Sequence, residues 1–540
     1  MTAMRRRDLL GLFCLSLAVR LAVALLIRRP GYMDAAYYAA GAVRLAQSGG
    51  LSEPFLWNYL DDPTGIPHPG FLYWMPFPSL LAAPFAALFP GSFFALQLPF
   101  ILLSALLPLV AYALAWEATG RRRTARLAGL LTLFSGFFFP YWTLPETFAP
   151  FALFGSLALW LAGRKMQDRG GSLVGLLVSL LVGLLVGLLV GLAHLTRADG
   201  ILLLPIVALA PLFSPQSRNT QHVSRITLVI LGYLFAMTPW FLRNMSVIGT
   251  PLSPAGTKTL WLTTYDDLFC YGCDLSLRSY LAWGWGNVVH SKLWAAWVNF
   301  ERFLAEDCLI FLFPFVLVGL YRLRRRPPFT LSFIYLLLIY LVHSLAFTFP
   351  GPRGGFFHAS AAVLPFVFAA GAGGLEAAVG WAGQRRHWNL RQAQTVFAVA
   401  TAVLAVLLSF HAAAWKLPAW QKADTVYPEV GQWLVRQGAA EATVMIANPP
   451  AFWYYTGHPA VVVPNGDVGT LLAVADRYGV RYVLLDQNRP APLAGLYAGE
   501  MPHPRLQPVT AWGEKEEQVI LFTVEQTRVL LTGGVNLHSP

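Results

Sequence analysis

An aspartate follows the first long apolar run of the chain. Asp34 lies in the segment GYMDAAYYAAGAVRLAQSGG, close to Tyr37 and Tyr38. A carboxylate held at a membrane face could accept a proton from a hydroxyl or an amine. The simpler explanation is that Asp34 caps the helix that follows it, since aspartate is common at that position. Taken alone, these residues leave both explanations open.

A second acidic residue, Glu146, stands in YWTLPETFAPF at the entrance to a later apolar run. Its neighbours Tyr141 and Trp142 place it at a membrane boundary, where it becomes a second candidate for acid–base chemistry. The alternative is a favourable interaction between the carboxylate and the positive end of a helix.

Several lone arginines stand at the ends of apolar runs. Arg197 lies in GLAHLTRADGILLLP, Arg243 in PWFLRNMSVIGTPLSP and Arg353 in FPGPRGGFFHAS. Ionisable residues at membrane depth are costly and usually face a cavity. Arg197 could pair with Asp199, or it could hold a phosphate through two hydrogen bonds. The three arginines indicate a bound anion, with contact to lipid headgroups as the alternative.

The composition indicates a membrane protein with many spans. Of 540 residues, 56% are hydrophobic and only 12% are charged, whereas soluble proteins carry about 25% charged residues. The net charge of +12 could point to nucleic acid. However, the basic residues form short clusters between apolar runs, as they do in cytoplasmic turns. We therefore expect contact with membrane lipid and no nucleic-acid partner.

The alternation of apolar runs and basic clusters predicts about eleven membrane-spanning helices. With the N-terminus inside, every basic cluster falls on one side, provided that the apolar segment 71–89 does not cross. Pro76, Pro78 and Pro84 weaken a helix there, so we assign 71–89 to the first outer loop, 30–96, as a re-entrant or interfacial element. The predicted spans are 9–27, 97–117, 127–142, 147–163, 173–192, 199–213, 226–242, 304–320, 329–347, 356–382 and 394–414.

The chain changes character after Trp415, where mixed polar and apolar residues replace the long apolar runs. We divide it into a membrane module, 1–415, and a soluble domain, 416–540, which the topology places on the extracytoplasmic side. The domain should be a small α/β fold with a partly parallel sheet. It contains no GxGxxG motif or phosphate loop, so nucleotide binding is not expected there. Predicted strands are 443–447, 460–464, 481–486, 506–511 and 518–524, and predicted helices are 427–437, 450–456 and 467–478.

Two cysteines stand close together in an outer loop. Cys270 and Cys273 form the sequence CYGC, which allows either a local disulfide or two free thiols. Because no second pair of ligands accompanies them, a zinc site is not expected.

Several motifs, in order, resemble those of the GT-C fold glycosyltransferases. DAAYYAAGAVRLAQSGG, followed by HPGFLYWMPFPSLLAAPF, resembles the first outer loop of this superfamily. The superfamily includes the dolichyl-phosphate-mannose protein mannosyltransferases and the bacterial aminoarabinose transferases of lipid A. LPETFAPFALFGSLALWLAGRK resembles their second acidic turn, and GLAHLTRADGILLLP their arginine-containing motif. The resemblance covers about residues 8–415.

This resemblance implies a function and a set of site residues. It implies hexosyl or pentosyl transfer from a polyprenyl-phosphate-linked sugar to a lipid, polysaccharide or protein acceptor outside the inner or plasma membrane. Asp34 and Glu146 match the catalytic acids. The residues expected to face the donor phosphate are Arg197, Arg243, Arg353 and His358, and those expected to contact acceptor or sugar are Tyr37, Tyr38, His68 and Trp74.

The chain departs from the pattern at one position. Many members have paired acids in the first loop, whereas Asp34 is followed by Ala35. We therefore assign no metal ligands and leave a divalent metal open. Two alternatives to a transferase are a flippase or exporter of lipid-linked sugars and a non-catalytic glycan-binding protein. The absence of an internal repeat and the gathering of polar residues at one face favour the transferase.

Overall fold

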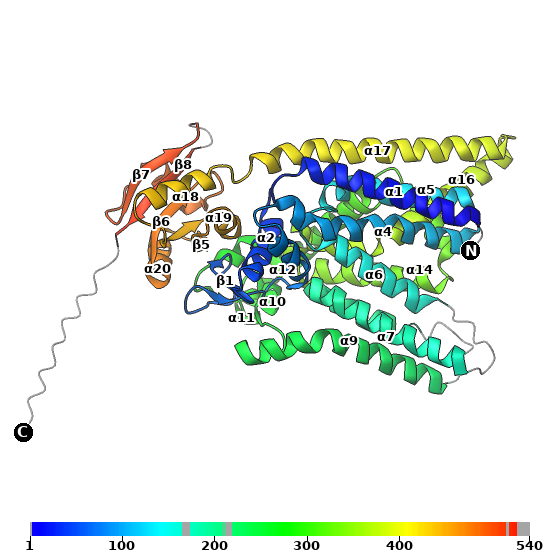
Figure 1. Cartoon of the computed structure of the whole chain (residues 1–540), viewed down its shortest axis with the longest axis horizontal. Helices are drawn as coiled ribbons and strands as arrows, with labels where there is room; N and C mark the ends of the chain where they lie inside the picture. The colour runs from blue at the N-terminus through cyan, green and yellow to red at the C-terminus, as the bar shows by residue number, and fades with distance from the viewer. Residues whose placement is uncertain (1–2, 165–172, 209, 211–218, 515–517, 526–540) are drawn as a thin grey trace, which may run out of the picture. The chain divides into compact units, whose positions relative to one another are not determined.

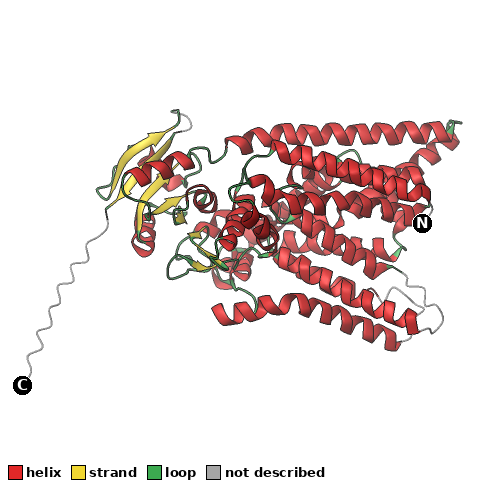
Figure 2. Cartoon of the chain, in the orientation of Figure 1, coloured by secondary structure: helices red, strands yellow, loops and turns green. Residues whose placement is uncertain are grey.

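The computed structural model describes residues 3–164, 173–208, 210, 219–514 and 518–525. Their contacts divide the chain into two compact units, a larger helical one and a smaller one that contains the main sheet (Figures 1 and 2). The larger unit comprises Met1–Ser52, Pro69–Tyr265 and Asp274–Ala423, and the smaller unit comprises Glu53–His68, Asp266–Cys273 and Asp424–Pro540. The predicted boundary at 415 therefore falls inside the last helix of the larger unit, which continues to Lys422.

The larger unit is built almost entirely of helices. Its longer helices form where apolar residues run without interruption, as expected for segments that exchange water for lipid. The α-helices are α1 (Ala3–Leu26), α2 (Met33–Ala46), α3 (Phe77–Leu88), α4 (Phe93–Thr119), α5 (Arg122–Leu133), α6 (Phe148–Gly163), α7 (Leu173–Thr196), α8 (Leu203–Ala208), α9 (Asn219–Ile248), α10 (Ala255–Lys258), α11 (Leu277–Ala282), α12 (Trp285–Arg302), α13 (Phe313–Leu323), α14 (Pro327–Leu341), α15 (Phe356–Ser360), α16 (Leu364–Arg385) and α17 (Leu390–Lys422). The tighter and wider turns are the 3₁₀ helices η1 (Gly136–Tyr141), η2 (Ala198–Leu202), η4 (Thr259–Trp261) and η9 (Ala361–Val363) and the π-helices η6 (Phe303–Asp307), η7 (Val342–Ala346) and η8 (Gly351–Gly355).

Membrane-crossing helices recur along this unit, so the predicted polytopic helical fold is confirmed. In the part of the chain that the structure describes, six helices are long and apolar enough to cross a membrane, and five apolar helices are shorter. The predicted count of about eleven spans stays a prediction. The six are Arg6–Leu26, Phe93–Thr119, Arg225–Ile248, Pro327–Ala346, Gly351–Arg385 and Leu390–Arg436, and the shorter ones are Phe77–Leu88, Phe148–Gly163, Leu180–Thr196, Ala198–Ala208 and Phe313–Leu323.

The helix expected over 127–142 is interrupted. α5 ends at Leu133, and η1 begins at Gly136, which has a positive φ of 61°, a conformation that suits glycine. The backbone groups that the break releases find side-chain partners. The Arg20 guanidinium donates to the Leu133 carbonyl at 3.1 Å, and Ser409 Oγ accepts from the Gly136 N–H at 2.9 Å. These bonds allow an irregular turn inside an apolar bundle.

The apolar segment 71–89 forms a short helix. α3 has 12 residues, which corresponds to about 18 Å at 1.5 Å per residue, less than the thickness of a hydrocarbon core. Ser79 Oγ donates to the Tyr38 carbonyl at 2.9 Å and ties α3 to α2. The length and this contact favour the predicted role as an element of the first outer loop.

Close packing joins α7 to α9. A Cβ atom added at Gly187 would lie 2.0 Å from the Val229 carbonyl oxygen, and one added at Gly232 would lie 2.2 Å from the Leu184 carbonyl oxygen. Glycine therefore lets the two backbones approach within lipid. Apart from Arg164, the basic cluster RKMQDR lies outside the described residues, as does most of the end of the predicted span 199–213.

The smaller unit contains a six-stranded mixed sheet in the order β2-β5-β4-β6-β8-β7. β2, β5, β4 and β6 are parallel, and β8 and β7 are antiparallel to their neighbours, which confirms the predicted partly parallel sheet. β2 comes from the first outer loop and was not predicted. The strands are β2 (Phe55–Leu56), β4 (Thr443–Ile446), β5 (Ala460–Val462), β6 (Val480–Leu485), β7 (Leu506–Trp512) and β8 (Val519–Val524), with two further short strands β1 (Ser52–Glu53) and β3 (His68–Pro69), and the helices are η5 (Tyr265–Phe269), α18 (Tyr427–Arg436), α19 (Pro449–Thr456), α20 (Val468–Tyr478), η10 (Ala491–Leu493) and α21 (Ala494–Tyr497).

The CYGC loop also belongs to the smaller unit. Cys270 and Cys273 are joined by a disulfide bond, one of the two alternatives that the sequence allowed. The adjacent Phe269 carbonyl accepts from the Asn465 N–H at 2.8 Å, and Tyr271 packs against the apolar core. The loop is therefore an integral part of the smaller unit.

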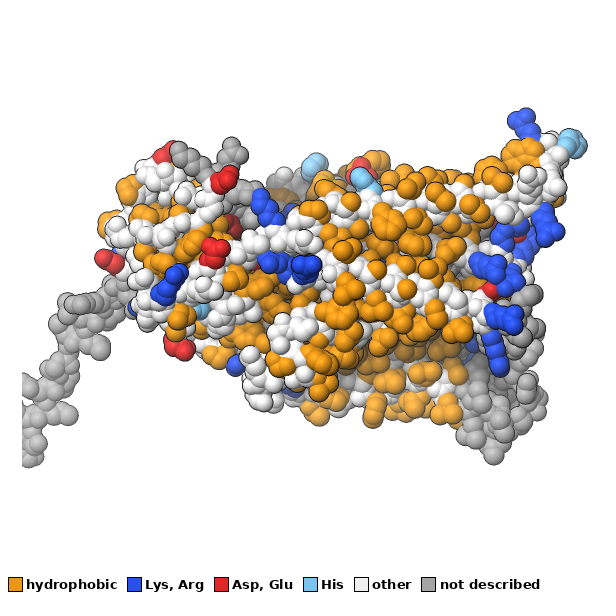
Figure 3. All heavy atoms as spheres, turned by 45° about the horizontal axis from the view of Figure 1, so that its top comes forward, with side chains coloured by type: hydrophobic (Ala, Val, Ile, Leu, Met, Phe, Trp, Pro, Cys, Tyr) orange, Lys and Arg blue, Asp and Glu red, His pale blue; other side chains and the backbone are white. Residues whose placement is uncertain are grey.

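Basic side chains gather at the end of the helical unit that holds the start of α1 (Figure 3). Asp8, in the first turns of α1, receives hydrogen bonds from Arg122, Arg126 and Tyr112. Glu376 of α16 forms ion pairs at about the same end with Arg121 at 2.9 Å and Arg123 at 3.1 Å. Arginines at the start of α5 therefore pair with both carboxylates.

Candidate functional site

Asp34 lies in the first turn of α2, directly after the end of α1. Tyr32 occupies the N-cap position, and no side chain caps the helix there. Asp34 is therefore not the capping residue that the simpler explanation required. Its side chain is 32% exposed, so it is only partly buried.

Glu146 lies in the turn before α6, and its side chain is only 1% exposed. Its carboxylate accepts from the Phe148 N–H at the start of α6 and from the Thr147 hydroxyl, both at 3.2 Å. The helix end therefore stabilises the charge, as the sequence suggested. This structural role does not exclude a catalytic one, because the Glu146 carboxylate also contacts His358.

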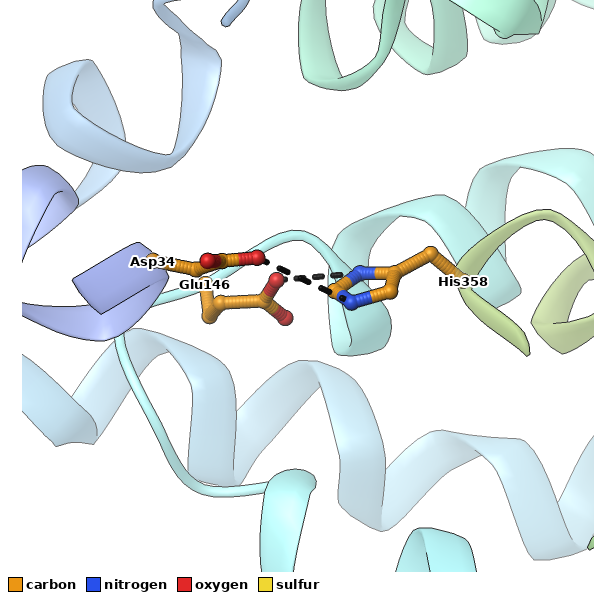
Figure 4. A group of neighbouring side chains, drawn as sticks. All are labelled: Asp34, Glu146 and His358. Carbon is orange, nitrogen blue, oxygen red and sulfur yellow. Dashed lines mark ion pairs between the residues drawn. The ribbon is translucent and has the colours of Figure 1, made fainter. Parts of the chain in front are cut away.

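His358 of α15 joins the two acidic residues. Its Nδ1 lies 3.0 Å from Glu146 Oε1, and its Nε2 lies 3.8 Å from Asp34 Oδ2 (Figure 4). One ligand atom from each of the three residues lies within 4.8 Å of the others. Three segments far apart in the sequence thus supply a compact group of two carboxylates and one imidazole, which we call the acidic triad.

The acidic triad changes the acidity of its exposed member. The pKa of Asp34 is raised to about 6, because burial and, to a smaller extent, the nearby Glu146 carboxylate raise it more than His358 and Arg197 lower it. A carboxyl group with a pKa near neutrality can both accept and release a proton at physiological pH. Such shifts are concentrated at functional sites.

Arg197 stands near the acidic triad but is committed to an ion pair. Its Nε and Nη2 donate to the two carboxylate oxygens of Asp199 at 2.9 and 2.7 Å. Of the two explanations that the sequence left open, the pairing with Asp199 is the one present in this structure. The role of Arg197 at a donor phosphate stays a prediction.

The two later arginines differ in their surroundings. Arg243 of α9 donates to the Leu51 carbonyl at 2.8 Å and lies over the ring of Trp240. It therefore supports the part of the first outer loop that follows α2. Arg353 of η8 is exposed and lies 5.0 Å from the ring centroid of Tyr265. Among the residues that the structure describes, no acidic side chain pairs with Arg353. Of these two, Arg353 is the cation better available to an anion.

The residues predicted to contact the sugar are divided between the units. Tyr37 and Tyr38 are buried in α2 and pack against Trp74, with ring centroids 4.7 and 6.1 Å away. His68 belongs to the smaller unit, where its Nε2 lies 3.0 Å from the Phe55 carbonyl oxygen and 3.7 Å from Glu53. Their contact with a sugar stays a prediction.

Sequence reasoning missed His343. Its Nε2 lies 3.2 Å from Asp199, and the side chain is 6% exposed. A signal was available, because His343 is an ionisable residue at the end of the apolar run 329–347, where such residues usually have a function. Its partners could not be read from the spacing.

Comparison with known proteins agrees with this architecture. The profile of the family described as dolichyl-phosphate-mannose-protein mannosyltransferase matches residues 68–242, a range that includes Glu146 and Arg197. No curated protein sequence matches the chain. The bundle of spans, the outer helices and the α/β unit define a membrane protein of the GT-C fold, as the sequence motifs predicted.

Solved structures with this fold cover most of the chain. ArnT from Cupriavidus metallidurans in the apo state has a TM-score of 0.58 at 13% identity, covering 95% of this chain and 98% of ArnT. The same protein bound to undecaprenyl phosphate has a TM-score of 0.56 at 14% identity with the same coverage. The oligosaccharyltransferase AglB from Archaeoglobus fulgidus, in complex with an inhibitory peptide and a dolichol-phosphate, has a TM-score of 0.51 at 13% identity, covering 90% of this chain and 70% of AglB.

Proposed function

We propose that this protein is a membrane glycosyltransferase that moves a sugar from a polyprenyl-phosphate donor to an acceptor at the extracytoplasmic face. The observation that supports this most directly is the acidic triad, at the opposite end of α1 from the basic end of the unit. The similar proteins ArnT and AglB are described in complex with undecaprenyl phosphate and dolichol-phosphate, which supports a lipid-linked donor. The sugar would be a hexose or a pentose.

In the proposed reaction, Asp34 accepts the proton of the acceptor hydroxyl or amine. The acceptor oxygen or nitrogen then bonds to the anomeric carbon of the sugar, and the bond from that carbon to the phosphate oxygen breaks. Polyprenyl phosphate leaves with the electron pair. Asp34 suits this role because it is the exposed carboxylate of the triad, whereas the buried Glu146 orients His358 through the 3.0 Å contact.

Arg353 is the side chain that we assign to the leaving phosphate. A guanidinium matches the geometry of phosphate oxygens and stabilises the charge that develops on them. Arg353 is exposed, has no acidic partner within the described residues and stands five residues before His358 in the chain. Arg197 acts electrostatically on Asp34, but a phosphate that bound Arg197 would have to share it with Asp199.

The acidic triad also fits a divalent cation. Two carboxylate oxygens and one imidazole nitrogen within 4.8 Å of one another are donors that zinc or manganese accepts. When bound, such an ion would supply Lewis-acid polarisation of an oxygen. Asp34, Glu146 and His358 would hold it, and the partial exposure of Asp34 would leave one side open to the acceptor.

A transfer assay on the full-length protein tests the proposal. Wild type and Asp34→Asn are reconstituted into nanodiscs with labelled undecaprenyl-phosphate-linked hexoses and pentoses and with acceptor lipids. We expect wild type to release undecaprenyl phosphate, and Asp34→Asn to lower the rate about 10³-fold, within the range for losing a general base. The variant Asp8→Asn removes a paired carboxylate at the other end of α1 and serves as the matched control.

Two results would contradict the proposal. Movement of the lipid-linked sugar between leaflets without cleavage would identify a carrier. Binding of glycans with neither cleavage nor movement would identify a non-catalytic protein. If wild type cleaves the donor and Asp34→Asn does so equally well, the enzyme stands but Asp34 is not its base.

A further inference from the structure

Asp199 connects two parts of the helical unit that are far apart in the sequence. It lies in η2, directly after α7, and receives two hydrogen bonds from Arg197. It also receives a hydrogen bond at 3.2 Å from Nε2 of His343, which lies in η7 at the end of α14. All three side chains are largely buried, with exposures of 10% for Asp199, 16% for Arg197 and 6% for His343. We call them the Asp199 clamp.

The clamp holds a glycine-rich turn. A Cβ atom added at Gly351 would lie 2.0 Å from the His343 carbonyl oxygen, and one added at Gly355 would lie 2.9 Å from His343 Nδ1. The turn η8 is therefore packed directly against His343 and has no room for a side chain at either position. Arg197 Nη2 also donates to the Gly355 carbonyl at 3.4 Å.

This turn leads directly into the acidic triad. His358 follows Gly355 by three residues, in the short helix α15. η8 is a π-helical turn that is kinked at Gly354, whose φ of 154° is not helical, so the regular helical backbone is interrupted before α15. The position of His358 therefore depends on what holds η8 in place.

We propose that Asp199 is a positioning residue for this site. Through Arg197 and His343 it fixes the turn 351–355, and thereby sets the distances from His358 to Asp34 and Glu146. The catalytic consequence rests on the proposed function. A pair that merely neutralised the charge of Arg197 would not require the contacts of His343 and of the Gly355 carbonyl, which make the clamp more than an isolated ion pair.

Hydrogen exchange and kinetics on the reconstituted full-length protein test the proposal. The variants are Asp199→Asn and His343→Ala, with Asp8→Asn as the matched control, because Asp8 is also a buried aspartate paired with arginine. We expect amide hydrogens in peptides that cover 350–360 to exchange faster than in wild type for both clamp variants. For the control, the exchange rate of these peptides should not change. We also expect kcat to fall about 10- to 100-fold in both variants, as for a displacement of about 1 Å. The donor KM should change less than about twofold in His343→Ala, which leaves the pair of Arg197 and Asp199 in place.

A conservative substitution of His343 tests whether the effect can be partly reversed. His343→Gln keeps a side-chain N–H that can reach Asp199, so it should recover part of both the exchange protection and kcat relative to His343→Ala. Unchanged exchange over 350–360 in both clamp variants would overturn the proposal, as would an equal change in the control. Faster exchange with an unaltered kcat would also overturn it. If wild type transfers no sugar, the proposed function fails, and the exchange data still decide whether Asp199 holds the turn.

Discussion

Carboxylates lie near both ends of α1, and their partners differ. At the start of the helix, Asp8 receives hydrogen bonds from two arginines and a tyrosine. Just beyond the other end, Asp34 and Glu146 share the single imidazole of His358. A carboxylate neutralised by guanidinium groups is chemically inert, whereas an acidic pair with one weak base can bind a proton or a cation.

The difference teaches how to separate structural from functional charges in a membrane protein. Glu376 is as buried as many catalytic acids, but Arg121 and Arg123 pair with it. Glu146 is more deeply buried and has only hydrogen bonds from neutral donors besides His358. Burial alone does not distinguish the structural glutamate from the candidate functional one. The residues that pair with each carboxylate distinguish them. The predictions below test this comparison.

Among the variants that test this comparison, the largest effect is expected when the two buried glutamates, Glu146 and Glu376, are each replaced by glutamine. Glu146→Gln removes the negative charge that faces His358 and should lower kcat of sugar transfer about 10²-fold, a typical loss when acid–base geometry is disturbed. Glu376→Gln should leave kcat within about twofold. The measurement is initial release of undecaprenyl phosphate by both variants at saturating donor. Equal loss in the two variants would show that the comparison has no functional meaning.

The pH dependence should report the acidic triad. Asp34 must be ionised to accept a proton, and its pKa is raised to about 6, with His358, Glu146 and Arg197 as the charged neighbours. The rate should therefore rise with pH, by about tenfold per unit below pH 6, and level off above it. The profile of kcat/KM between pH 4.5 and 8 checks this. A profile that levels off already near pH 4 would indicate an unperturbed carboxyl group.

A smaller effect is expected at the proposed phosphate contact. Arg353→Ala should raise the donor KM about tenfold, as expected for one charge-assisted hydrogen bond at a partly exposed site. Arg121→Ala removes an exposed arginine of the basic end and should leave the donor KM unchanged. Titration of the labelled donor against both variants measures this. An unchanged KM for Arg353→Ala would assign the phosphate to other cations.

The smallest effect on activity is expected at the basic end. Asp8→Asn should leave the rate unaltered and cost about 1–3 kcal/mol of unfolding free energy, because Arg122 and Arg126 lose a charged acceptor. Thermal unfolding in detergent, followed alongside the transfer assay, checks both parts. Loss of transfer without loss of stability would place a second functional site there.

The sequence predicted the architecture to a large extent. The apolar runs and the position of the basic clusters predicted the polytopic fold, and the strands expected over 443–447, 460–464 and 481–486 are β4, β5 and β6. These features depend on local composition and periodicity. β2 was missed because its two residues acquire their strand conformation only by pairing with β5.

The sequence alone identified candidate residues for the functional site. Asp34 and Glu146 were recognisable as ionisable residues at the ends of apolar runs, where charges are costly. His358 was a candidate only through the family resemblance, which assigned it to the donor phosphate. The tertiary structure alone decided that these three meet, that Arg197 pairs with Asp199 and that His343 supports the turn before His358. Such contacts join α2, the turn before α6, η2, η7 and α15, and no local pattern encodes which distant segments will pack together.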